Sequence, residues 1–504
     1  MFTLQELEHA LRALLASGGV EIIEDGRRQP VVGQLHWEML AFGGEPRIHL
    51  WCEQWNLVRS IQQVDELSEN RIVLSVRRFG RRTPGRIELI AQGQATIPRR
   101  LSRAVFLHRF RSLLEEGFPD DRLVHLVMAS DLEHSFSGAH ARGIQVRGPR
   151  GFALVGVGGE EESPVVDGIL TTGLLWYDWL RRRAKPWVLA GLRVFVPRGH
   201  SLGLALRLRG LRQELTIQLY EYDPEQWRLR PVDVRDTGNL QTELSPLRQT
   251  QLLLEQARSL VERIQRLVPD AIDAAVVPGR AEVAIRVRGL EIARWRGGQC
   301  LYGYPERNRE LTEQNWSRFA RWVKGVAARR HPAARDRQNR YYRAQAERWL
   351  EAMILREPTT VEAQLRPEFL YAQVPAWVGG DRGVIDLLGV TRSGRLAVFE
   401  LKVNESLHLP LQALDYWTTV YLHQKQDQFR RYGYFPGVEL QEKPPLLYLV
   451  APALRFHSTL EMILQYFSPE VEVICVGLRE DWRNGLRVVH RHWATRRSVS
   501  GSRK

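Results

Sequence analysis

Two charged side chains interrupt a strand-like segment that is otherwise apolar. Residues 396–403 read Leu-Ala-Val-Phe-Glu-Leu-Lys-Val, so Glu400 and Lys402 share one face of a predicted strand. The segment before it, residues 383–389, is apolar except for Asp386. Because an unpaired buried charge is very costly, we expect these three side chains to serve a site rather than a core.

A turn over residues 391–394 joins the two segments, so they can form a hairpin that brings Asp386 beside Glu400. Converging carboxylates are ligands for a hard cation, and Mg²⁺, or Mn²⁺ in its place, needs few of them because it keeps several waters. Such an ion lowers the pKa of bound water and stabilises the charge that develops on a phosphate. Lys402 faces the same way and can orient the attacking water or offset that charge. These residues therefore predict metal-dependent phosphodiester hydrolysis.

The lysine is informative because this chain seldom uses lysine. Lysine and arginine together number 72, and only six of these residues are lysines. A compact ammonium suits a place beside an attacking water, whereas a guanidinium is broad and planar. Lys402 therefore departs from the composition of the chain at a chemically special position.

The spacing of these charged residues resembles that of a known family. Asp386, a gap of 13 residues and the run Glu400-Leu401-Lys402 together resemble the signature of the PD-(D/E)xK (restriction-endonuclease-like) nuclease superfamily, although the family's proline before the aspartate has no counterpart. The resemblance covers about residues 340–480. It implies a restriction-endonuclease-like domain in which Asp386 and Glu400 bind the metal, Lys402 is catalytic and DNA is the substrate.

The same resemblance implies supporting residues on the flanking helices. The family places a further acidic residue on the helix before the hairpin, and Glu347 stands there, with Glu351 one turn later as its rival. Gln412 and Tyr416 follow the catalytic strand and resemble the Gln-x-x-x-Tyr motif of the RecB-like branch. Gln373, just before the hairpin, can line the cleft or make a hydrogen bond at the strand edge.

Strand-like and helical segments alternate over residues 336–490, which predicts an α/β fold with a mixed central sheet flanked by helices. The regions before it contain more hairpin patterns. The expected organisation is a β-rich accessory region with helices (1–120), a nuclease-like α/β domain (121–235), an accessory region with a helix and a β-hairpin (236–335), the nuclease domain (336–490) and a basic disordered tail (491–504).

Residues 142–221 resemble the predicted nuclease region, because both have the same order of strand, helix and strands. If the two regions are copies, our alignment puts Gly156 and Gly158 in the places of Glu400 and Lys402. The first copy would then be a degenerate, non-catalytic nuclease fold. The alternative is that two unrelated segments have converged on one α/β pattern.

The chain is strongly basic, with a net charge of +14 and a pI of about 10. Such a charge favours a polyanionic partner, DNA first, with RNA left open. The basic stretches of the sequence can contact phosphates of a nucleic acid. The alternative is that they are charged faces exposed to solvent. The arginines expected to bind nucleic acid are Arg77, Arg78, Arg81, Arg82, Arg340 and Arg343.

Other features narrow the class of protein. No apolar run approaches the ~18 residues of a membrane span, and the N-terminus lacks the pattern of a signal peptide. We therefore expect a cytoplasmic protein with no membrane partner, and a homodimer remains open. Cys52, Cys300 and Cys475 form no CxxC pair and the histidines form no HxxxH pair, so reduced core thiols are expected rather than a zinc site.

A second class of function stays open beside the nuclease. The same fold could belong to a catalytically silent nucleic-acid-binding or scaffolding protein, in which the acidic residues and the lysine form a structural salt-bridged cluster. The complete set of Asp386, Glu400 and Lys402 favours the enzyme.

Overall fold

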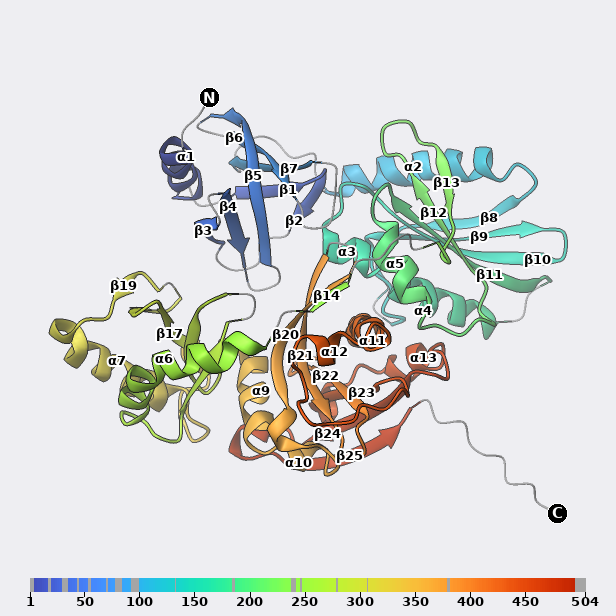
Figure 1. Ribbon diagram of the computed structural model, residues 1–504. Coiled ribbons are helices and arrows are strands. Elements are labelled where there is room, and N and C mark those ends of the chain that lie inside the picture. The colour runs from blue at the N-terminus through green and yellow to red at the C-terminus, as the bar shows by residue number, and fades with distance from the viewer. Residues whose placement is uncertain are drawn as a thin grey trace, which may run out of the picture. The chain divides into compact units, whose positions relative to one another are not determined.

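The computed structural model describes residues 4–16, 20–29, 35–42, 45–52, 56–68, 71–77, 84–91, 99–131, 133–183, 186–236, 242–244, 247–277, 280–305, 307–378 and 381–494. The chain divides into two compact units, Met1–Gln241 and Thr242–Lys504 (Figure 1). Each unit contains an antiparallel sheet followed by a mixed sheet. Among the described residues, no helix is long and apolar enough to cross a membrane.

The first unit begins with helix α1 (Leu4–Ala16) and a seven-stranded antiparallel sheet of order β2-β1-β7-β6-β5-β4-β3. Leu7, Leu11 and Leu14 of α1 recur at helical spacing and are buried in one core with the sheet. The strands are β1 (Val20–Glu24), β2 (Arg27–Gln29), β3 (His36–Phe42), β4 (Glu45–Trp51), β5 (Asn56–Leu67), β6 (Arg71–Arg77) and β7 (Gly85–Ala91).

A six-stranded mixed sheet of order β13-β12-β11-β10-β9-β8 completes the first unit. Its parallel strands need crossover helices, because a tight turn cannot join parallel neighbours. The strands are β8 (Arg122–Val127), β9 (His140–Arg147), β10 (Arg150–Val157), β11 (Val188–Pro197), β12 (Ile217–Tyr222) and β13 (Leu229–Val232). The helices are α2 (Arg99–Gly117), α3 (Ser163–Asp167), α4 (Ile169–Arg181) and α5 (Ser201–Leu208).

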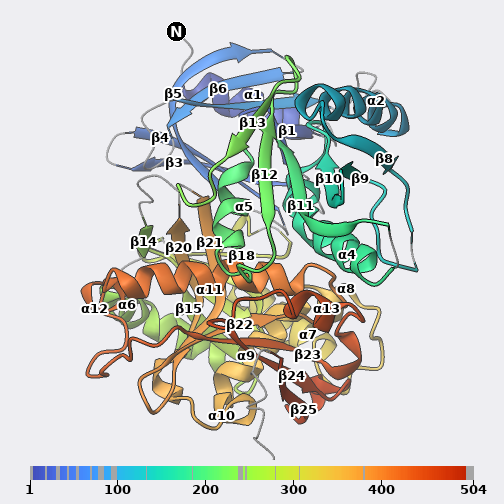
Figure 2. The same ribbon diagram turned by 90° about the vertical axis from the view of Figure 1, so that its right-hand side faces the viewer.

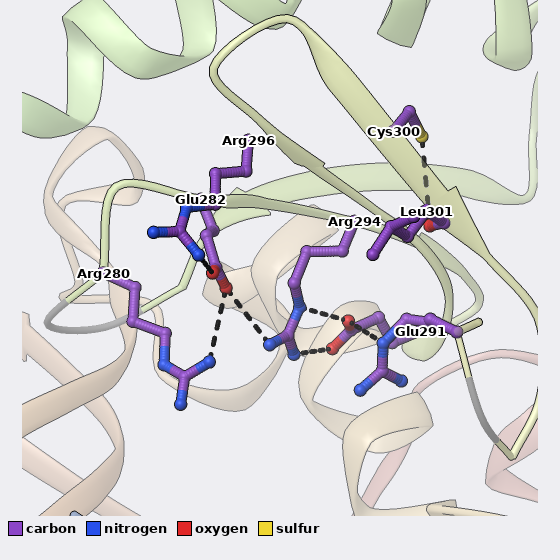
Figure 3. Close-up of polar contacts among 8 residues, drawn as sticks. Arg280, Glu282, Glu291, Arg294, Arg296, Cys300 and Leu301 are labelled. Atoms are coloured by element: carbon purple, nitrogen blue, oxygen red, sulfur yellow. Dashed lines mark hydrogen bonds and ion pairs between the residues drawn. The ribbon is translucent and has the colours of Figure 1, made fainter. Parts of the chain in front are cut away.

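The second unit opens with a five-stranded antiparallel sheet that shares one hydrophobic core with two amphipathic helices. Arginine and glutamate side chains form a network along the central strand, residues 290–296, and the segment just before residue 283, which Figure 3 shows around Glu282 and Glu291. The elements are β14 (Thr242–Leu244), α6 (Arg248–Gln265), β15 (Ile272–Val276), β16 (Val283–Val287), β17 (Leu290–Arg296), β18 (Gln299–Tyr302), β19 (Arg309–Glu310), η1 (Glu313–Asn315) and α7 (Trp316–Arg329).

A seven-stranded mixed sheet of order β14-β20-β21-β22-β23-β24-β25 forms the rest of the second unit. The strands are β20 (Tyr371–Val378), β21 (Asp381–Val390), β22 (Leu396–Leu401), β23 (Leu446–Pro452), β24 (Glu472–Leu478) and β25 (Val488–Trp493). The helices are α8 (Arg340–Arg343), α9 (Ala346–Arg356), α10 (Pro358–Val361), η2 (Pro367–Phe369), α11 (Leu409–Lys425), α12 (Gln428–Arg431), η3 (Ala453–Arg455), α13 (Leu460–Leu464) and η4 (Trp482–Asn484).

Helices cover both faces of this sheet. Trp349 and Leu350 of α9 pack in one core with Phe399 and Leu401 of β22. Helix α11 packs against β22 and β23 from the other side, in front of the sheet in Figure 2. Side chains alternate between the faces of a strand, so Glu400 points toward the α11 side.

The predicted mixed α/β class is confirmed, and two details differ from the predicted organisation. Strand β14 falls within the predicted accessory region 236–335, yet it pairs with β20 of the mixed sheet. The predicted disordered tail is wrong at its start. Residues 491–493 belong to β25, because they pair with β24 and because Arg491 bonds to Glu362 at 3.0 Å.

The two mixed sheets share their strand order and strand directions. Strand β14 adds one antiparallel pair to the second sheet. Apart from it, each sheet has two antiparallel pairs, then three parallel strands and then an antiparallel edge strand. The last paired residues also correspond, since Pro197 pairs with Tyr222 and Pro452 pairs with Leu478. The sheet and helices predicted within residues 121–235 are therefore present.

Candidate active site

The β21–β22 hairpin brings two carboxylates to the end of its ladder. Leu387 pairs with Phe399, so the next facing positions are Asp386 and Glu400. The Leu401 backbone N–H donates a hydrogen bond of 3.1 Å to Asp386 Oδ2. This contact fixes the Asp386 side chain against β22, in agreement with the predicted hairpin.

Glu400 is buried, with 1% of its surface exposed. Its Oε1 atom accepts a 3.0 Å ion pair from Lys402 Nζ, whereas its Oε2 atom is buried and has no hydrogen-bond partner. A buried carboxylate oxygen without a partner costs on the order of 1–3 kcal/mol or more. A cation bound at Oε2 would remove that cost.

The electrostatics of the site couple its charges. Burial raises the pKa of the Glu400 carboxyl well above its ordinary value, and Asp386 raises it further, while Lys402 opposes both. Burial alone would lower the pKa of the Lys402 ammonium, but Glu400 and Glu347 outweigh it and raise that pKa. The arrangement is therefore rich in negative charge, which a single lysine offsets only in part.

The acidic residue at the start of α9 faces this cluster. Burial raises the pKa of the Glu347 carboxyl, Lys402 lowers it, Asp386 raises it, and a hydrogen bond from the Val403 backbone lowers it. Glu347 therefore lies within electrostatic reach of the carboxylate pair and the lysine. Glu347 can therefore bind a ligand, whereas Glu351 on the next turn is already held by other side chains.

Glu351 is the rival acid, and its contacts are already saturated. It is 2% exposed and accepts hydrogen bonds from Arg348 at 2.9 Å and from Gln373 at 2.6 Å. Arg286, which comes from β16, lies 3.6 Å from its other oxygen. Sequence reasoning missed both arginines, and no local signal connects Arg286 to a helix more than sixty residues later.

Gln373 links Glu351 to the hairpin. Its amide nitrogen also lies 3.4 Å from Asp386 Oδ1, so it bridges the two acids. The Gln373 backbone has a φ of 54°, a left-handed conformation that L side chains rarely adopt. Such strain persists where surrounding structure imposes it, and it is frequent at functional sites.

Helix α11 contributes one of its two predicted residues to the cluster. Burial raises the pKa of the Tyr416 phenol well above its ordinary value, and the charges of Glu400 and Asp386 add to the effect. Tyr416 therefore lies within electrostatic reach of the carboxylate pair. Gln412, one turn earlier, has an exposed side chain.

The donor set suits a hard cation with few protein ligands. Asp386 and Glu400 offer carboxylate oxygens only, and Mg²⁺ or Mn²⁺ can be held by one or two such groups with water in the other positions. Among the described residues, this cluster does not place three Asp, Glu, His or Cys ligand atoms within 4.8 Å of one another. The unpartnered Oε2 of Glu400 is the feature that fits the ion best.

The predicted nucleic-acid-binding arginines divide into three groups. Arg340 and Arg343 are exposed on α8, where Arg340 bonds to Tyr341 Oη at 2.8 Å and Arg343 bonds to Gln338 at 3.1 Å. Arg77 is exposed at the end of β6 in the first unit. The remaining three, Arg78, Arg81 and Arg82, lie outside the described residues.

The predicted equivalence of Gly156 and Gly158 with the catalytic positions is wrong by one residue. A Cβ atom on Gly156 would lie 2.5 Å from Phe110 of α2, and one on Gly158 would lie 3.4 Å from Phe106. Both glycines therefore face α2, whereas Glu400 faces the crossover helix α11. A slip of one residue transfers every side chain of a strand to the other face.

The strand registers identify the correct equivalents. Gly156 lies opposite Phe195, two residues before Pro197, just as Leu401 lies opposite Val450, two residues before Pro452. In the first unit the positions of Asp386, Glu400 and Lys402 are consequently held by Arg142, Val155 and Val157. None of the three offers a carboxylate.

Comparisons with known proteins add little. No protein-family model and no curated protein matches the chain. Among solved structures the chain is similar to the crystal structure of a repair endonuclease from Pyrococcus abyssi, with 10% sequence identity and a TM-score of 0.15, over 44% of this chain and 96% of that chain. A TM-score this low does not establish a shared fold.

Proposed function

We propose that the chain is a metal-dependent nuclease of the PD-(D/E)xK type, which hydrolyses phosphodiester bonds in DNA with Mg²⁺ or Mn²⁺. The observation that carries the proposal is Glu400, a buried carboxylate with one oxygen on Lys402 and the other unpartnered beside Asp386. A structural ion pair alone does not require that second oxygen to be left without a partner.

The residues of the chain have separate tasks in this proposal. Asp386 and Glu400 hold the ion, which when bound supplies an activated water and stabilises charge on the phosphate. Lys402 donates hydrogen bonds to the attacking water or to the non-bridging phosphate oxygens. Glu347 assists as an outer ligand or holds water, while Tyr416 closes the α11 side of the cluster.

Gln373 and Glu351 act as positioning residues. Arg348 and Arg286 neutralise Glu351, which in turn holds the amide of Gln373 against Asp386. This chain of contacts restricts the rotation of the Asp386 carboxylate. Precise orientation of metal ligands through outer hydrogen bonds commonly changes metal affinity or activity by about 10–100-fold.

The charge of the chain supports nucleic acid as substrate. A net charge of +14, almost all of it from arginine, favours sequence-independent contacts with phosphates. The first unit has no carboxylate at the positions equivalent to the active pair, so each chain would carry one active site. One site cleaves one strand at a time, and a duplex substrate should therefore be nicked.

A catalytically silent nucleic-acid-binding protein is the second candidate function. The 3.0 Å ion pair between Lys402 and Glu400 favours it, because the pair partly neutralises the buried carboxylate without a metal. The two candidates differ in their response to divalent cations. If the protein is catalytically silent, the nucleic acid should stay uncleaved with or without Mg²⁺, and removal of Mg²⁺ should not change the affinity for it.

Cleavage of a substrate panel tests the proposal. Supercoiled, linear, single-stranded, branched and mismatched DNA, together with RNA, are incubated with the full chain and Mg²⁺, Mn²⁺ or a chelator. We expect metal-dependent cleavage of at least one DNA substrate. Asp386→Ala should lose this cleavage and still bind the DNA. Binding to the panel without cleavage under any metal condition would favour the silent protein.

A further inference from the structure

A second group of metal-ligating side chains lies at the far edge of the C-terminal mixed sheet. Cys475 of β24 is directly opposite His492 of β25 in the antiparallel ladder, and Glu461 comes from helix α13. One ligand atom of each residue lies within 4.8 Å of the other two. The group therefore joins three elements that are separate in the chain.

The alternation of β25 turns its histidines toward this group. His490 and His492 share one face of the strand, whereas Arg491 between them faces the other way and bonds to Glu362 at 3.0 Å. Opposite His490 stands Gly477, where a Cβ atom would lie 3.2 Å from the histidine Cβ. The glycine therefore leaves room for the imidazole on this face.

The hydrogen bonds of His492 hold it in the orientation of a metal ligand. Its Nε2 atom lies 2.6 Å from Glu461 Oε1, and its Nδ1 atom lies 2.8 Å from His490 Nε2. A histidine that binds a metal through Nε2 carries its proton on Nδ1 and donates it to a neighbouring acceptor. His490 is placed as that acceptor, which leaves His492 Nε2 directed toward Glu461 Oε1.

We propose that Glu461, Cys475 and His492 bind a zinc ion, with His490 as the outer hydrogen-bond partner and water in the fourth position. A mixed set of sulfur, nitrogen and oxygen donors is typical of Zn²⁺. Mg²⁺ is excluded here by its preference for oxygen ligands. The proposal does not depend on the proposed nuclease activity.

The movement that zinc requires can be worked out for Glu461 and His492, whose ligand atoms lie 2.6 Å apart. Tetrahedral zinc, with bonds of about 2.0–2.3 Å, keeps its ligand atoms roughly 3.3–3.8 Å apart. Cys475 is fully buried and fixed in the sheet, so the adjustment falls on Glu461, whose side chain is 58% exposed. Its carboxylate must move back from His492 by less than about 1 Å to admit the ion.

Bound zinc would tie helix α13 and the edge strand β25 to the interior of the sheet. The three ligands come from α13, β24 and β25, and β25 is the last strand of the described chain. This site lies on β24 and β25, whereas the carboxylate pair lies on β21 and β22. Binding at one site can therefore be measured apart from binding at the other.

Cobalt substitution of the full chain tests this proposal. The protein is stripped with a chelator under reducing conditions and titrated with Co²⁺, whose bond to a thiolate gives a charge-transfer band in the near ultraviolet. We expect one equivalent of Co²⁺ to produce the band and Zn²⁺ to abolish it by competition. Binding of Co²⁺ to Asp386 and Glu400 produces no such band, because those ligands are oxygens.

Matched variants assign the band to its residues. Cys475→Ser should lose it, whereas Cys300→Ser, which changes a buried cysteine of the other sheet, should retain it. Glu461→Gln alters an exposed side chain and should weaken Co²⁺ binding in a folded protein, and His490→Ala should weaken it by about 10–100-fold. No band in excess Co²⁺, or a band that is unchanged in Cys475→Ser and Glu461→Gln, would overturn the proposal.

Discussion

Replacing Glu291 by glutamine tests the charge network of the five-stranded sheet in the second unit. Arg294 makes two hydrogen bonds to the Glu291 carboxylate, at 2.8 and 3.0 Å (Figure 3), and Arg307 Nε lies 3.0 Å from it. Burial acts to raise the pKa of this carboxyl, but Arg294 and Arg307 outweigh it and lower the pKa from 4.5 to about 2. The side chain is only 16% exposed, so solvent screens these contacts little.

The size and sign of the effect follow from linkage. A carboxyl whose pKa is lower in the folded protein stabilises it above the unfolded pKa and loses that effect as the pH falls toward the folded pKa. The shift corresponds to a stabilisation of about 3 kcal/mol at pH 7, which shrinks to about 1 kcal/mol at pH 3. Glu291→Gln should therefore destabilise β16–β18 strongly at pH 7 and weakly near pH 3.

Hydrogen exchange of the amides in residues 290–302 measures this local stability. At pH 7 the variant should exchange about 300-fold faster than the parent protein, and at pH 3 about tenfold faster. Glu313→Gln is the matched control, because it breaks an exposed pair with Arg263 and should change exchange little. Equal exchange at pH 7, or a difference that does not shrink with falling pH, would refute the reasoning.

Three further predictions concern catalysis, binding and the first unit. Lys402→Arg should reduce cleavage by about 10²–10³-fold with little change in DNA affinity, since the guanidinium does not fit the place of the ammonium; a kcat within a few-fold of the parent would contradict the role. DNA affinity should fall by about 10³-fold between 50 and 200 mM salt if some six phosphates are contacted, and a flat salt dependence would exclude nucleic acid as the partner. Gly156→Ala should destabilise the first unit by about 1–3 kcal/mol, because its methyl group would lie against Phe110. The control is Gly203→Ala, whose added methyl group would meet no atom within 4 Å and should not lower the Tm in thermal unfolding. Equal Tm values for the two variants would contradict the assignment of Gly156 to the face covered by α2.

The hairpin of the candidate site could be predicted because its signal is local. Asp386, Glu400 and Lys402 are charged positions on strands that are otherwise apolar, and the turn between the strands fixes their register. The two predicted acids of α9, Glu347 and Glu351, are one helical turn apart and therefore share a face of the helix. Both lie within electrostatic reach of Asp386 on the hairpin. Residue spacing alone could not decide between them.

The choice between Glu347 and Glu351 depends on contacts that sequence spacing does not encode. Glu351 is neutralised in part by Arg286, which belongs to a different sheet, and it accepts a hydrogen bond from Gln373, whose backbone is left-handed. The pairing of β14 with β20 joins residues more than a hundred positions apart. Such contacts arise from tertiary packing, and no local pattern signals them.

The one-residue error in the first unit has the same origin. Gly156 and Gly158 alternate like Glu400 and Lys402, so the pattern alone matched them. Only the packing of α2 against the glycines reveals which face they occupy. The opposition of Cys475 and His492 likewise depends on strand pairing, and the spacing of cysteines and histidines gave no indication of it.

In the proposed mechanism Glu400 is indispensable to metal-dependent cleavage, and one comparison of variants tests this most directly. The parent chain, Glu400→Ala and Glu442→Ala, which changes an exposed glutamate in the loop before β23, are incubated with the DNA panel and Mg²⁺ under single-turnover conditions. We expect cleavage by the parent and by Glu442→Ala, with nicked circles as the product from supercoiled plasmid, and no cleavage above background by Glu400→Ala at unchanged DNA affinity. Cleavage by Glu400→Ala at the rate of the parent would contradict the central claim.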